Sequence, residues 1–195
     1  MRSSNGGFEF DKRAAGAAKL LVVSIDDGLF GCHLDWVEAV YQETLPAQLM
    51  RHGGGRARPF VVHGGAAAAV VDLRELLGLE AALGRVRRPG HLLVRSGTGL
   101  LALPIDACAG VRELDLSGHT PLPTRVLRDG GLPLGHLIEF DGRILTVLDP
   151  NRLLDDALRA ELAPLQAKAQ TLLERQARAA VLWEEIRREA DAERV

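Results

Sequence analysis

The sequence has few aromatic residues and almost no net charge. Aromatic side chains make up 4% of the 195 residues and apolar side chains 47%, so a folded core must consist mainly of Leu, Val and Ala. Lys and Arg number 24 against 26 Asp and Glu, a formal net charge of −2. That balance argues against a nucleic-acid-binding protein, which usually carries a basic excess. It argues equally against a polybasic membrane anchor.

Cysteines and long apolar runs are also scarce. The two cysteines, Cys32 and Cys108, form no CxxC pair, which excludes a zinc knuckle and a thioredoxin-like motif. The longest apolar run, residues 66–71, is too short to span a bilayer. Residues 1–19 lack the apolar segment of a secretory signal, and we expect them to form a flexible tail. We therefore expect a cytoplasmic protein with no direct membrane insertion.

The reactive side chains do not combine into a catalytic site. Cys32 and His33 are neighbours, but neighbours on a strand point to opposite faces and cannot act as nucleophile and base. The six histidines form no HxxxH or HxH pair of the kind that binds a metal. Neither glycine run, 53–55 or 64–65, continues as a nucleotide-binding loop. The sequence predicts no catalytic, metal-binding or cofactor-binding residues; a small hydrolase using Cys32 is the enzyme alternative.

The chain contains what looks like one β unit twice. Residues 21–40 align with residues 92–111 without a gap, and residues 70–77 align with residues 147–154. Each copy begins with a strand, a tight Gly turn and a second strand, and each ends with a strand and an Asp. Chance similarity between two hairpins is the alternative. Duplication is favoured because both ends of the unit match in the same order.

Each unit contains five strand candidates, and five short strands that close on themselves leave few free edges. We therefore predict a mainly β fold with two five-stranded barrels, one over residues 20–83 and one over residues 91–149. The strand candidates are 20–25, 29–34, 37–42, 60–63 and 66–72 in the first unit, and 92–96, 100–105, 110–114, 134–140 and 143–149 in the second. Long loops are expected at 46–58 and 117–131, with a linker at 84–89.

The C-terminal segment, residues 155–195, is predicted to be an amphipathic helix. Apolar residues follow a 4-3 heptad spacing from Leu158 to Ile186, and Pro164 predicts a break near residue 163. Three interpretations remain open: a helix that lies on its own barrel, a coiled-coil or partner-docking helix, and disorder. The candidate interface residues of this helix are Leu165, Leu172, Trp183 and Ile186.

Four segments resemble the CheW-like family of chemotaxis coupling (adaptor) proteins. Residues 21–40, with Ile25-Asp26-Asp27-Gly28-Leu29-Phe30-Gly31, resemble the opening of the family's domain. Residues 65–74, ending in Val70-Val71-Asp72-Leu73-Arg74, resemble its most recognisable stretch, and residues 91–106 and 135–149 are similar too. The resemblance covers about residues 20–154. It implies two SH3-like five-stranded barrels around a shared hydrophobic core, and a non-catalytic scaffold that couples chemoreceptors to a CheA-type histidine kinase.

The resemblance also implies two partner surfaces. Kinase contact is implied for the strand at residues 37–40 and the turn at residues 64–65, and contact with the chemoreceptor cytoplasmic domain for the groove between the barrels. The implied partner-binding residues are Val37, Glu38, Val40, Gly64, Gly65, Asp72 and Arg74.

One residue of the implied kinase surface departs from the family pattern. The family usually has an Arg where this chain has Gly64, and glycine cannot replace the planar donor fork of a guanidinium. The alternative is therefore a divergent paralogue that serves another partner, with the C-terminal helix mediating self-association or docking.

Overall fold

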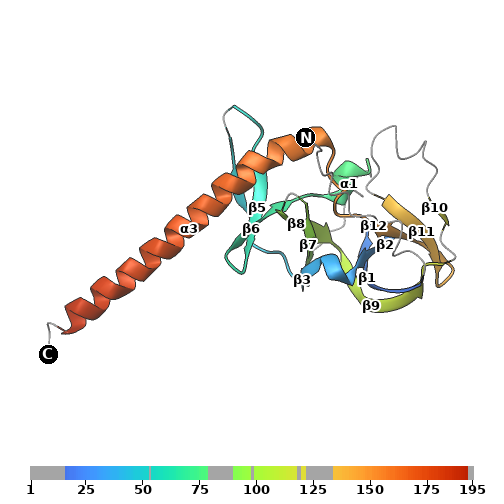
Figure 1. The fold of residues 1–195 in the computed structure, drawn as a ribbon, viewed down its shortest axis with the longest axis horizontal. Coiled ribbons are helices and arrows are strands. Elements are labelled where there is room, and N and C mark those ends of the chain that lie inside the picture. Colours follow the sequence, from blue (N-terminus) through green and yellow to red (C-terminus); the bar gives the residue numbers. More distant parts are fainter. Residues whose placement is uncertain are drawn as a thin grey trace, which may run out of the picture.

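In a computed structural model of the chain, two curved β-sheets lie side by side and a long helix extends away from them (Figure 1). The structure describes residues 16–52, 54–78, 90–97, 99–117, 120–121 and 134–192. The predicted linker lies outside the described residues, as do most of the predicted loop at 117–131 and residues 1–15 of the predicted flexible tail. Residues 17–19, which were included in that tail, are described and belong to the first strand.

All ten predicted strands are present, with two short strands in addition. The additional ones, β4 and β10, lie inside the segments that we expected to be loops, and a short helix follows β6. The strands are β1 (Ala17–Ile25), β2 (Gly28–His33), β3 (Val37–Tyr41), β4 (Gln48–Met50), β5 (Arg58–His63), β6 (Ala66–Val70), β7 (Gly90–Ser96), β8 (Gly99–Ile105), β9 (Ala107–Asp115), β10 (Thr120–Pro121), β11 (Leu134–Phe140) and β12 (Arg143–Leu148). The helices are η2 (Leu34–Trp36, a 3-10 turn), α1 (Leu73–Leu76) and α3 (Asp156–Ala192).

The two sheets have the same strand order once the repeat is taken into account. The first sheet runs β10-β11-β12-β2-β1-β9, and the second, taken from its other end, runs β4-β5-β6-β8-β7-β3. In the sequence repeat, β1 is equivalent to β7, β2 to β8 and β6 to β12. Among the described strands, each sheet has one parallel pair, β12 with β2 in the first and β6 with β8 in the second, and these two pairs are equivalent in the repeat. The pairing therefore supports an internal duplication.

The division into two sequential barrels is wrong in one respect, because each unit gives its first hairpin to the other unit's sheet. Strands β1 and β2 pair with β9 and β12, whereas β7 and β8 pair with β3 and β6. Each sheet therefore has six strands, drawn from both segments 20–83 and 91–149. A repeat shows which segments are alike, but it does not show whether a strand pairs within its own copy or across to the other. The mainly β architecture with a C-terminal helix is confirmed.

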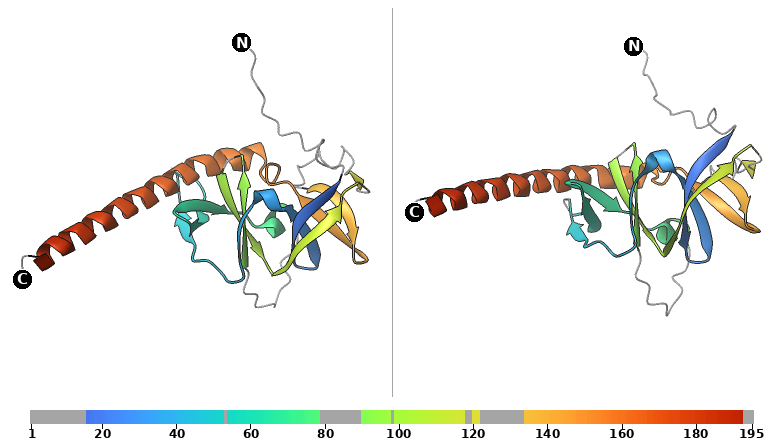
Figure 2. Two further views of the ribbon diagram at one scale, coloured as in Figure 1. Left: turned by 60° about the horizontal axis from the view of Figure 1, so that its bottom comes forward. Right: turned by 90° about the horizontal axis from the view of Figure 1, so that it is seen from below.

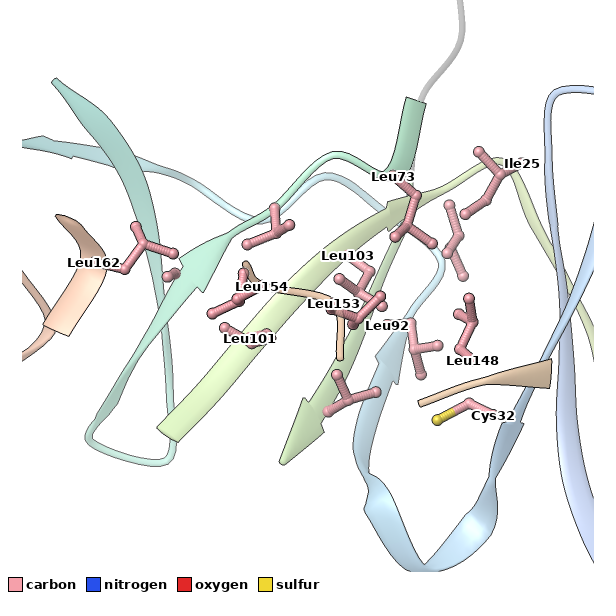
Figure 3. Close-up of a cluster of buried hydrophobic side chains, with 14 of the residues drawn as sticks. Ile25, Cys32, Leu73, Leu92, Leu101, Leu103, Leu148, Leu153, Leu154 and Leu162 are labelled. Carbon is pink, nitrogen blue, oxygen red and sulfur yellow. The ribbon is translucent and has the colours of Figure 1, made fainter. Parts of the chain in front are cut away.

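Strand β1 is buried on both faces, and its successive side chains point alternately into two apolar clusters. Leu20 and Val22 point into the interior of the first sheet, whereas Leu21, Val23 and Ile25 point into a core shared by both sheets. Successive side chains on a strand point to opposite faces, so the strand forms a wall between two apolar clusters. Strands β7 and β8 are equivalent walls of the second sheet. Figure 3 shows the shared core, with Leu92, Leu101, Leu103 and Leu148 around its centre.

The second sheet is curled so that strands distant in its order come together. The Tyr41 hydroxyl oxygen, at the end of β3, lies 2.6 Å from Nδ1 of His63, at the end of β5. Three strands separate β3 from β5 in the sheet. The curled sheet encloses a cluster that includes Val61, Ala68 and Ala102, and the small alanine side chains suit a tightly curved interior.

Helix α3 is continuous through Pro164, so the predicted break is wrong. Proline removes one helical hydrogen bond and costs about 3 kcal/mol inside a helix. Leu162 and Leu165, on either side, are fully buried in the shared core, and each such burial stabilises by about 1.5–3 kcal/mol. The helix begins after Asp155, whose carboxylate accepts the N–H of Leu158 at 2.7 Å.

The contact between β3 and β7 can be tested at the glycine that begins β7. A Cβ on Gly90 would overlap the carbonyl oxygen of Tyr41, whereas a Cβ on Gly97, just after β7, would lie 3.4 Å from the Asn151 side chain. We expect Gly90→Ala to lower the free energy of unfolding by about 2–3 kcal/mol, and Gly97→Ala to change it by less than about 1 kcal/mol. Urea denaturation measures both, and equal effects would contradict the close approach at Gly90.

Candidate partner-binding surface

Strand β3 offers an open edge next to half-buried valines. It pairs with β7 on one side, and in the described part of the chain no strand pairs with its other edge. The register shifts between Val37 and Ala39, so the irregularity falls at Glu38. The Glu38 carboxylate forms an ion pair with Arg95. Val37 and Val40 are half-buried and pack against the shared core, so they combine a structural role with partial exposure.

The turn between β5 and β6 is exposed and built from two glycines. Gly64 and Gly65 have φ angles of +56° and +78°, a backbone conformation that favours glycine. The sequence did not indicate what lies beside this turn. The Gln170 side chain of α3 donates to the Gly65 carbonyl and accepts the N–H of Ala67, both at 3.3 Å. Helix α3 of the chain itself therefore contacts the turn at which the resemblance implies kinase contact.

Polar contacts hold the first half of α3 on the second sheet. Arg58 of β5 makes two hydrogen bonds of 2.9 Å to the Glu161 carboxylate, and these hydrogen bonds hold the pKa of Glu161 below its ordinary value. Gln166 donates to the Leu100 carbonyl at 3.1 Å. Leu165, which we expected on an interface of the tail, is only 1% exposed and packs in the chain's own core. This prediction is corrected: Leu165 is not available to a partner.

The second half of α3 projects away from the sheets (Figure 2). Leu172 is 39% exposed, and further along the helix Trp183 and Ile186 are 67% and 53% exposed. The interpretation of a helix that lies on its own barrel therefore applies to the first half of α3, and partner docking stays a prediction for the second half. The first half lies on its own sheet, and the second presents apolar side chains that the described part of the chain does not cover.

Arg74 joins segments that belong to different sheets. Its guanidinium lies 2.7 Å from Asp106, at the junction of β8 and β9, and 3.4 Å from Asp26, in the turn after β1. It also lies 3.3 Å from Asp72, whose carboxylate accepts the N–H of Arg74 and caps α1. The N–H of Asp26 donates to Asp106 at 2.6 Å. Partial burial lowers the pKa of Arg74, but the carboxylates outweigh that effect and raise it.

This network changes the interpretation of two implied partner residues. The Arg74 side chain is 14% exposed, and most of its donors are already used inside the chain. Asp72 caps a helix and pairs with the same guanidinium. Both residues therefore connect the sheets, and little of Arg74 is left for a partner.

The buried groups do not form a reactive set. Burial, together with the nearby Asp149 carboxylate, raises the pKa of Cys32 to about 12, so its thiol stays protonated. A pocket of about 290 Å³ lies between α1 and α3. Its charged side chains already have contacts within the chain: Arg58 pairs with Glu161, Asp72 with Arg74 and Glu75 with Arg56, and Asp155 accepts the N–H of Leu158. Among the described residues no group of three His, Cys, Asp or Glu side chains is arranged to hold a metal ion. No helix of the described part is long and apolar enough to cross a bilayer.

Comparisons with known proteins agree with this architecture. A family model described as "CheW-like domain" matches residues 19–158. Among solved structures, the scaffolding protein TtCheW from Thermoanaerobacter tengcongensis superposes with a TM-score of 0.57 and 17% sequence identity, covering 71% of this chain and 92% of that chain. At this identity the likeness shows the fold alone. No curated protein matches the chain.

The Arg74 network predicts a large difference between two arginines. Arg74→Ala removes the guanidinium that pairs with three carboxylates, and we expect the free energy of unfolding to fall by about 2–3 kcal/mol. The control is Arg56→Ala, because Arg56 makes only an exposed ion pair with Glu75, which is worth less than about 1 kcal/mol. Urea denaturation of both variants measures the difference. Equal loss in the two variants would show that Arg74 does not connect the sheets.

The two thiols are expected to react at very different rates. Cys32 is buried, whereas Cys108 is partly exposed. At mildly alkaline pH, one thiol per folded chain should react rapidly with a disulfide reagent, and the second only after unfolding. The Cys108→Ser variant should lose the fast phase. A fast phase that persists in this variant would show that Cys32 is accessible and would revive the enzyme alternative.

Proposed function

The chain belongs to the CheW-like domain family, and on that premise we propose that it is a cytoplasmic, non-catalytic adaptor that couples chemoreceptors to a CheA-type histidine kinase. The family match over residues 19–158 supports the scaffold role. The buried, protonated Cys32 and the Arg58–Glu161 ion pair of the α1–α3 pocket are consistent with binding rather than catalysis.

The observation that carries the kinase surface is the contact between Tyr41 and His63. Strand β3 ends at Tyr41, and His63 directly precedes the turn at Gly64 and Gly65. The 2.6 Å contact between the two side chains brings the end of β3 beside this turn, although 22 residues separate them. We propose that the two segments form one kinase surface, in which β3 contributes Val37, Glu38 and Val40 and the turn contributes both glycines.

We propose a more limited role for Asp72 and Arg74. Their side chains fix α1 against both sheets, so they position the receptor groove rather than supply its main contacts. The pocket between α1 and α3 is lined by Asp72 and by Val70, Leu76 and Leu158 among others. A receptor helix with a small apolar side chain would fit such a lining.

A second candidate function is favoured by the neighbourhood of Gly64. The turn lacks the family's Arg, and Gln170 of α3 binds its backbone. In this alternative the chain is a divergent paralogue whose partner contacts the turn and α3 together. Gln170→Ala removes the α3 side chain beside the turn and leaves β3 unchanged, so it separates the two functions. Kinase binding is retained if the β3 surface carries it, and is weakened if α3 beside the turn is part of the interface.

The proposed kinase surface can be tested with charge substitutions on β3. We expect Val37→Glu to weaken binding to a CheA-type kinase by about tenfold or more, because it places a charge on a partly apolar surface. Glu38→Arg is a second variant, which reverses a charge and leaves the core packing intact. Binding is measured by titration with the purified kinase, and circular dichroism checks that each variant is folded.

The matched control is Ile144→Glu. Ile144 is 67% exposed on β12 of the other sheet, so the same chemical change is made away from the proposed surface. We expect its kinase affinity to equal that of the unmodified chain. Unchanged affinity in folded Val37→Glu and Glu38→Arg would refute the assignment of this surface.

A further inference from the structure

The second half of α3 exposes a row of apolar side chains on a single helix. All described side chains after Leu173 are exposed, and the large apolar ones include Leu182 and Trp183 at 58% and 67%. From residue 174 to residue 192 the helix extends about 28 Å, at a rise of 1.5 Å per residue. An isolated helix of this length is marginally stable in water. A row of exposed apolar side chains on such a helix indicates an interaction surface.

The row continues the stripe that holds the first half of α3 on the sheet. Leu162, Leu165 and Ala169 are buried, and the same 4-3 spacing continues beyond them. The exposed positions of the stripe are Leu172, Gln176, Ala179, Trp183 and Ile186. A 4-3 spacing is the pattern with which one helix packs along another. The spacing suits a second helix as the partner of this segment, because the sheet that covers the first half does not reach it.

We propose that this partner is the same segment of a second copy of the chain, packed antiparallel, with Trp183 of one copy against Ala179 of the other. Side-chain size favours this direction. A parallel pair would put Trp183 against Trp183 and Ala179 against Ala179, which combines overcrowding with a gap. An antiparallel pair centred at residue 181 puts the largest side chain opposite the smallest in two equivalent layers.

The distribution of charge favours the same direction. At the start of the exposed segment, Arg175 and Arg178 outnumber Glu174. Towards its end, the carboxylates of Glu184, Glu185 and Asp191 outnumber the two neighbouring arginines, of which Arg188 pairs with Glu184 within the helix. An antiparallel pair places the basic part of each helix beside the acidic part of the other. A parallel pair would place like charges together.

The body of the protein fixes where the two helices can overlap. The sheet covers α3 as far as Leu173, so a second helix can pack only beyond that point, and an overlap centred at residue 181 uses the free segment of each copy. The two bodies then lie at opposite ends of the pair. Ile186 of one copy lies opposite Gln176 of the other, which borders a small hollow lined by Val62, Ala169 and Leu172. This inference does not rest on the adaptor function.

The first test is the mass of the full chain in solution. We expect sedimentation equilibrium to show a mass that rises with concentration towards twice the 21.0 kDa of one chain. Ile186→Glu should raise the dimer dissociation constant by at least about tenfold. Val181 is 59% exposed on the opposite side of the same helix segment, so Val181→Glu is the matched control and should leave the constant unchanged.

The second test determines the direction of the helices. In a Cys108→Ser background, with the buried Cys32 left in place, Leu182→Cys and Ile186→Cys are treated with a short bismaleimide. In the antiparallel pair the two residues 182 are offset by about 3 Å along the axis and the two residues 186 by about 15 Å. We therefore expect covalent dimers from Leu182→Cys and not from Ile186→Cys.

Three results would overturn the proposal. A single-chain mass at every concentration would show that the segment does not bind a second copy. Equal effects of Ile186→Glu and Val181→Glu would show that the stripe is not the interface. Crosslinking at residue 186 and not at residue 182 would show a parallel pair. Kinase binding is measured separately through β3, so failure of the dimer leaves the adaptor function untouched, and the converse also holds.

Discussion

The structure depends on burying three strands on both faces at once. Strands β1, β7 and β8 each contribute alternate side chains to the shared core and to the interior of their own sheet. Exposing either face of such a strand would lower the stability of the fold greatly, because burial of each Leu or Val side chain stabilises it by about 1.5–3 kcal/mol. The exchange of hairpins between the units creates this arrangement, because it makes each sheet incomplete without strands from the other half of the chain. The two sheets therefore form one folding unit.

Two groups of charged side chains are used for contacts within the chain. Arg74 and its three carboxylates tie the turn after β1, helix α1 and the β8–β9 junction together. Arg58 and Glu161 attach α3 to β5. Of the segments considered as partner surfaces, β3 keeps an edge that no described strand pairs with, and the glycine turn and the second half of α3 are exposed.

Helix α3 uses a single heptad stripe for two different purposes. Its first half adds Leu162, Leu165 and Ala169 to the shared core and anchors the helix. The anchored half then orders the free half, because helix propagation costs less than nucleation. The free half is thereby presented at a fixed direction from the sheets (Figure 2). The 4-3 spacing of the stripe does not change along the helix, so the sequence does not show at which residue α3 ceases to contact the sheet.

Local periodicity and spacing were enough to predict the strands, the repeat and the amphipathic helix, and they showed no motif for catalysis. The family resemblance pointed to the segments of β3 and the Gly64 turn as one partner surface. Three features could be seen only in the folded chain: the first hairpins are exchanged, Arg74 makes its contacts within the chain, and Leu165 is buried while Trp183 is exposed. Local patterns specify which face of an element is apolar. What packs against that face depends on contacts between residues far apart in the chain, as Arg58 and Glu161 show across 103 positions.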